Sequence, residues 1–189
     1  MRCYAAFLRG VNVGGVNLKM ADVAAALAAA GFDDVRTVLA SGNVVFNAPG
    51  DAVTVRTAAE IALRREFDYE AWVLVYDIDT VREIAAAYPF PAGGNDRHSY
   101  VTFVSDPHVL GELAALAGPD DQIVRGQGVL YWQVPRYGTL GSTVGKTMGK
   151  RRYKSTTTTR NLRTVNKVIQ IGTAQMSTAQ IGTARVDSE

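Results

Sequence analysis

The residues best suited to bind an anion follow the first apolar stretch of the chain. Residues 4–8 are apolar, and Arg9 comes directly after them, ahead of a loop that contains Asn12, Gly14 and Gly15. Adjacent glycines reach backbone angles that other residues avoid, so such a loop can curl tightly or let a ligand approach its backbone. The guanidinium of Arg9 can bind a carboxylate or a phosphate. The simpler interpretation is a glycine turn with Arg9 in a structural ion pair.

Positive charge is concentrated in the last third of the sequence. Residues 1–120 contain 9 Lys/Arg and 15 Asp/Glu, whereas residues 121–189 contain 11 and 3. Eight basic residues and no acidic one occur between Lys146 and Lys167. This asymmetry indicates either an anionic partner for the basic part or docking of the basic part on the acidic part.

A run of threonines leads into Arg160 and Asn161, where a final helix over residues 160–169 is predicted. Thr158 or Thr159 can cap that helix, and the N–H groups at its start would then favour an anion. A capped helix with a solvated basic face is the alternative.

Other kinds of chemistry have little support. His98 and His108 are the only histidines, and Cys3 is remote from both, so neither a metal site nor a cofactor is expected. Residues 141–147 resemble a phosphate-binding P-loop but have three residues between the glycines where that motif has four. No set of catalytic residues is identified, which leaves open whether the protein is an enzyme.

The pattern of apolar residues and turn signals predicts the element order β-α-β-β-α-β for residues 1–78. This is the ferredoxin-like (plait) arrangement, an antiparallel sheet with two helices on one face. Residues 79–169 are predicted to form a second plait-like half without the closing strand, entered by a helix that Asp79 caps. The chain is therefore expected to be α+β, and residues 170–189, without sustained periodicity, to be a flexible and dispensable tail.

Three ordered motifs carry a resemblance to a known family. They are residues 8–15, residues 35–46 with the turn at residues 41–43, and residues 158–161. Over residues 3–169 the chain resembles the bacterial domain-of-unknown-function family DUF1697. In this family a tryptophan is usual after the last motif, where Leu162 stands here. The resemblance implies a fold but no established activity.

The polar and glycine residues of these motifs form the predicted ligand-binding set. If the last helix meets the end of the first sheet, they would bind a small phosphate or carboxylate. The alternatives are a nucleic-acid-binding protein that uses the basic segment 146–167, or an enzyme acting on a phosphorylated metabolite. The predicted set is Arg9, Asn12, Gly14, Gly15, Ser41, Asn43, Thr159, Arg160 and Asn161.

Sequence features also bear on compartment and partners. A single cysteine excludes an internal disulfide, and no targeting segment or apolar run of membrane-spanning length is found, so a cytoplasmic protein without a membrane partner is expected. Tyr131 and Trp132 would point to opposite faces of one strand, so only one could stack on an RNA base. Nothing indicates the oligomeric state.

Overall fold

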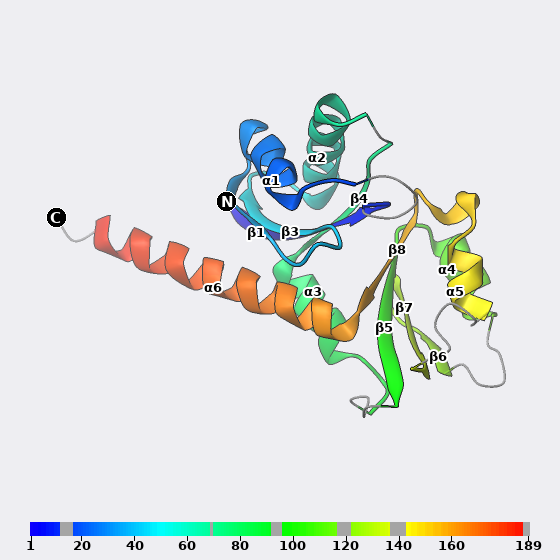
Figure 1. The fold of residues 1–189 in the computed structure, drawn as a ribbon. Coiled ribbons are helices and arrows are strands. Elements are labelled where there is room, and N and C mark those ends of the chain that lie inside the picture. Colours follow the sequence, from blue (N-terminus) through cyan, green and yellow to red (C-terminus); the bar gives the residue numbers. More distant parts are fainter. Residues whose placement is uncertain (12–16, 69, 92–95, 117–121, 137–142, 187–189) are drawn as a thin grey trace. The chain divides into compact units, whose positions relative to one another are not determined.

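The computed structural model describes residues 1–11, 17–68, 70–91, 96–116, 122–136 and 143–186. In the last helix it describes the backbone to residue 186 but the side chains only to residue 177. The chain divides into two compact units. Unit 1 comprises Met1–Arg82 and Asn166–Glu189, and unit 2 comprises Glu83–Val165. Figure 1 labels the helices and strands.

Unit 1 contains a four-stranded antiparallel sheet with the strand order β2-β3-β1-β4. Two helices, α1 and α2, pack against one face of it (Figure 1). The predicted order β-α-β-β-α-β is confirmed. The elements are β1 (Arg2–Arg9), α1 (Met20–Ala29), β2 (Asp33–Thr37), β3 (Asn43–Ala48), α2 (Ala52–Glu66) and β4 (Trp72–Asp77).

The core of unit 1 lies between the sheet and the two helices. Alternate residues of β1, namely Tyr4, Ala6 and Leu8, point into this core because successive side chains of a strand face opposite sides. Helix residues spaced one turn apart, such as Val23 and Leu27 of α1, cover them. The intervening residues of β1, from Cys3 to Arg9, therefore lie on the other face of the sheet.

Side-chain caps fix where two helices of unit 1 begin. Asp51 accepts a hydrogen bond from Thr54 N at 2.8 Å and caps α2, as the sequence allowed. The helix α3 (Ile78–Ala86) is capped by Asp77, which accepts from Thr80 N at 2.9 Å, and not by Asp79 as expected. Asp79 instead pairs with Arg82 one turn further along. The strand runs directly into the helix, so the last residue of β4 becomes the cap.

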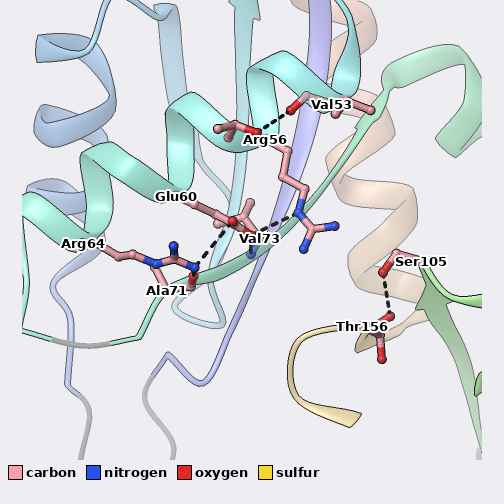
Figure 2. Close-up of polar contacts among 9 residues, drawn as sticks. Val53, Arg56, Glu60, Arg64, Ala71, Val73, Ser105 and Thr156 are labelled. Carbon is pink, nitrogen blue, oxygen red and sulfur yellow. Dashed lines mark hydrogen bonds and ion pairs between the residues drawn. The ribbon is translucent and has the colours of Figure 1, made fainter. Parts of the chain in front are cut away.

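A charged side chain of α2 accepts a hydrogen bond from the backbone at the outer edge of β4 (Figure 2). Glu60, which is mostly buried, accepts a hydrogen bond from Val73 N at 3.0 Å and pairs with Arg56 at 3.1 Å. Arg64 completes the group, because it donates to Ala71 O at 2.8 Å and contacts the second oxygen of Glu60 at 3.5 Å. These contacts occupy backbone groups that an edge strand otherwise offers to other chains.

Unit 2 repeats the topology of unit 1. Its sheet has the order β6-β7-β5-β8, in which each strand takes the place of its counterpart in the first sheet. A separate core forms between this sheet and the helices α4 and α5. The elements are β5 (Arg97–Val104), α4 (Pro107–Ala114), β6 (Gln122–Arg125), β7 (Val129–Pro135), α5 (Thr143–Met148), the short 3-10 helix η1 (Arg151–Tyr153) and β8 (Thr157–Asn161). The prediction of an α+β fold with two ferredoxin-like halves is confirmed.

The strand that closes the second sheet was missed in the sequence. Residues 157–161 pair antiparallel with β5 as β8, and the following helix begins at Leu162, not near Arg160. Threonine is β-branched and favours strands, so a threonine run can fill an edge strand as well as cap a helix. The second half is therefore a complete plait.

The last helix, α6 (Leu162–Val186), extends far past the predicted end at residue 169. Its residues from Asn166 onward belong to unit 1. Gly172 O lies 3.7 Å from Cys3 Sγ, and the buried Gln175 donates to Asp34 O at 2.6 Å. Residues 170–186, which were expected to form a flexible tail, are thus helical. They contact the rest of unit 1 at least as far as Gln175. Among the described residues, no helix has the length and apolar character needed to cross a membrane.

Close packing of α6 makes Gly172 a test position. A Cβ added there would lie 2.4 Å from Ile78 Cγ1, so Gly172→Ala should destabilise the chain by about 1–3 kcal/mol through overpacking. Gly111 of α4 has open space around it, and Gly111→Ala should stabilise by about 0.5–1 kcal/mol through helix propensity. Urea unfolding measures both. Equal stabilisation by the two substitutions would contradict the packing of α6 on Ile78.

Candidate functional site

Three residues of the predicted ligand-binding set meet at one end of the sheet in unit 1. Arg9 is the last residue of β1 and Asn43 is the first residue of its neighbour β3. Phe7 pairs with Asn43, so both side chains lie on the sheet face opposite the helices, and Arg9, two residues on, shares that face. Ser41 precedes β3 by two residues and is exposed. The strand ends are adjacent, as the sequence predicted.

The turn that carries Ser41 is held by a buried amide. Asn43 Nδ2 donates to Val38 O at 2.8 Å and to Ser41 Oγ at 3.0 Å, while Val38 N donates to Asn43 O at 2.8 Å. The side chain of Asn43 has no exposed surface. Its amide therefore closes the loop and positions the hydroxyl of Ser41, which keeps its own O–H free to donate.

Glycine is required where this turn touches β1. Gly42 has φ = 73°, and a Cβ there would lie 3.1 Å from Leu8 Cβ and 3.3 Å from Val11 Cβ. Leu8 N donates to Gly42 O at 2.8 Å across the same contact. Gly10, next to Arg9, also has a positive φ, of 79°. The residue directly after Arg9 and the residue directly after Ser41 thus each have a backbone conformation that favours glycine.

The guanidinium of Arg9 is partly removed from water. Burial lowers the pKa of Arg9 below its ordinary value, because desolvation disfavours the charged form. An arginine remains protonated even so, and its five N–H donors allow it to keep an internal contact and also bind a ligand. This end of the sheet therefore carries a positive charge at the end of β1 and a serine hydroxyl in the turn before β3. Asn12, Gly14 and Gly15 of the predicted set lie outside the described residues.

The other three predicted residues belong to β8 in unit 2. Thr159 Oγ1 lies 2.8 Å from Thr102 Oγ1 and 3.3 Å from Met148 Sδ, within the sheet and its core. Asn161 Oδ1 accepts from Arg163 N at 2.9 Å and so caps α6, the role that the sequence assigned to a threonine. Thr159 and Asn161 therefore have structural roles in unit 2.

Arg160 is buried and bonded within its own strand. Its Nη1 donates to Thr158 Oγ1 and to Thr159 O, each at 2.8 Å. Its backbone pairs with Val101 of β5 and is not at a helix start. Thr159 and Arg160 therefore do not form the start of the last helix, where an anion site was expected. A contribution of the Arg160 side chain to ligand binding stays a prediction.

Two cavities of unit 1 lie at the opposite end of β1. Seven residues of extended strand put them roughly 23 Å from Arg9. One of about 450 Å³ is lined in part by Arg2, Asn47, Asp77 and Asp79. Another, of about 430 Å³, lies beside Arg2 and Asp51. No motif in the sequence pointed to this end of the sheet; the nearest signal was Asp79, expected there only as a helix cap.

Cys3 lines the larger cavity but is a poor nucleophile. Burial, reinforced by the negative charges of Asp79 and Asp34, raises the pKa of its thiol to about 11. Within the part of the chain that is described, no group of three or more His, Cys, Asp and Glu residues could hold a metal ion.

The histidines and the candidate stacking residues lie in unit 2. His98 Nδ1 is 3.1 Å from Tyr100 Oη, and His108 is exposed in the first turn of α4. Tyr131 and Trp132 are both buried, at 4% and 2% exposure. Neither ring is available to stack on a base. These two residues therefore do not form the base-stacking surface of an RNA-recognition domain.

The fold and the strand-end geometry define an α+β protein of two ferredoxin-like units with the same strand order. The chain belongs to the family described as "Protein of unknown function (DUF1697)", whose profile matches residues 1–131. This confirms the resemblance seen in the sequence, although the motif at residues 158–161 lies beyond the matched segment. No curated protein matches the chain.

A solved structure shares the fold. It is described as the conserved bacterial protein SP0830 from Streptococcus pneumoniae, and it superimposes with a TM-score of 0.73 at 18% sequence identity. The match covers 90% of this chain and 98% of that protein. At this identity the likeness establishes the fold of both units and nothing about a ligand.

The buried amide gives a stability test of the candidate site. Asn43→Ala should lower the free energy of unfolding by about 2–4 kcal/mol, because two hydrogen bonds are lost and Val38 O is deprived of the amide partner. Asn47 of the same strand is the matched control, since its amide reaches only the exposed Asp34 carboxylate. Asn47→Ala should cost less than about 1 kcal/mol in the same urea titration. Similar losses would show that the turn does not depend on Asn43.

Proposed function

We propose that this protein is a small-anion binding module whose site lies at the end of the first sheet, where β1 ends and β3 begins. The ligand is a phosphate or carboxylate group. Arg9 supplies the charge, Ser41 a hydroxyl donor, and the loop containing Asn12, Gly14 and Gly15 supplies backbone N–H groups. Asn43 positions Ser41 and does not itself bind.

The partial burial of Arg9 is the observation that carries this proposal. A charged group that has lost part of its water gains more from an anion than an exposed one, because the local dielectric is lower. A guanidinium also matches the two oxygens of a carboxylate or phosphate in a bidentate geometry.

The neighbouring glycines support a close approach of ligand to backbone. Gly10, directly after Arg9, has a positive φ and nothing within 4 Å of the place a Cβ would take, so no side chain fills the space next to the strand end. Gly42, directly after Ser41, lets the turn pack closely against Leu8 and Val11. A site built from one guanidinium, one hydroxyl and loop amides suits a single anionic group better than a long polyanion.

Arginine replacement tests the site. Isothermal titration of inorganic phosphate and of acetate into Arg9→Gln should show affinity reduced by about tenfold to a hundredfold, the loss of a charge-assisted hydrogen bond of ~1.5–3 kcal/mol. Arg2, at the opposite end of β1, is exposed in the same unit, so Arg2→Gln removes the same charge away from the proposed site. Unchanged affinity in Arg9→Gln, or an equal fall in both variants, would rule out Arg9 as the ligand-binding cation. Arg160→Lys, measured in parallel, tests the second guanidinium of the predicted set.

A further inference from the structure

Unit 2 presents a group of positive side chains that the proposed anion site does not use. Lys146, Lys150, Arg151, Arg152 and Lys154 are all exposed, and they are called the basic surface here. They occur within nine residues that span α5 and η1. No acidic residue occurs between residues 143 and 161.

The local fold holds these charges outward. Val144, Thr147, Met148 and Tyr153 are buried against the core of unit 2, so the residues between them face solvent. Successive turns keep the segment compact, since Lys150 N donates to Thr147 O at 3.0 Å and Tyr153 N to Lys150 O at 3.1 Å. The basic surface is therefore displayed on an anchored segment.

Little negative charge balances the basic surface. Arg152 pairs with Glu112 of α4 and lies over the ring of Tyr153, whose hydroxyl also donates to Glu112 at 3.1 Å. Among the described residues, the other four basic side chains have no ion pair with a carboxylate. Grouped like charges repel one another, and a polyanion that binds across them relieves this repulsion.

We infer that the basic surface binds the phosphate backbone of duplex nucleic acid without reading its sequence. A duplex carries one negative charge per ~1.7 Å of axis, a density that can engage several side chains of a compact segment at once. The buried rings of Tyr131, Trp132 and Tyr153 leave no aromatic platform for unpaired bases on these elements. Phosphate contacts fix position but carry no sequence information.

The surroundings favour nucleic acid over a lipid surface. A helix that inserts at a membrane interface combines basic residues with exposed large apolar ones. The exposed large apolar side chains of the described residues are Met1, Leu39, Val53, Ile61 and Val124, and none is within residues 143–156.

Charge-matched variants test this inference on the full chain. Fluorescence anisotropy with a 20-base-pair DNA duplex should show affinity for the double variant Lys150→Gln/Arg151→Gln reduced by about tenfold or more at ~0.1 M salt. The slope of log K against log salt should become shallower by about 2, one for each lost contact. Two duplexes of unrelated sequence should bind equally well.

The control removes the same charge elsewhere. Arg36→Gln/Arg65→Gln replaces two exposed arginines of unit 1 and should leave duplex affinity unchanged. An equal loss in this control, no duplex binding by the wild type, or binding to vesicles of anionic lipid in place of the duplex would each overturn the inference. Phosphate binding through Arg9 should be unaffected by the basic-surface variant, so the two proposals can fail separately.

Discussion

The contact between Gly42 and β1 determines the geometry of the candidate site. Leu8 N donates to Gly42 O, and the two chains approach so closely that a side chain at residue 42 would collide with Leu8 and Val11. This contact sets which residue of β1 lies opposite β3, because a slip of one residue would turn every side chain to the other face. Arg9 and Asn43 share a face as a result, and the amide of Asn43 then fixes Ser41.

Local signals in the sequence were sufficient for the order of helices and strands in residues 1–78. The strands 2–9 and 43–48 are apolar and are bounded by turn signals. Asp51 begins α2 where the capping preference of aspartate places it. The second half repeats the topology, with the order β6-β7-β5-β8 matching β2-β3-β1-β4. In the first sheet, the predicted antiparallel pairing of β1 with β3 was enough to place Arg9 next to Asn43.

The features that escaped prediction depend on contacts between distant residues. A threonine run fits a strand or a cap, and only pairing with β5 makes residues 157–161 a strand. Residues 170–177 lack a strong apolar pattern, yet Gly172 packs against Ile78, and Gln175 bonds to Asp34 O, 141 residues away in the chain. The cap at Asp77 likewise follows from a strand that passes directly into a helix. The cavities beside Arg2 require the folded sheet and have no local signature.

The most direct test of the small-anion site is a phosphate titration followed by ¹H–¹⁵N NMR of the full chain. The proposed site predicts saturable shifts of the backbone amides of Gly10, Val11, Ser41 and Gly42, together with the Arg9 side-chain Nε–H resonance. Resonances of the basic surface should move little at the concentration that saturates these amides, because one small anion gains little from fully solvated surface charges. Shifts confined to residues 146–154, with the strand-end amides unchanged, would contradict a small-anion site at the end of β1.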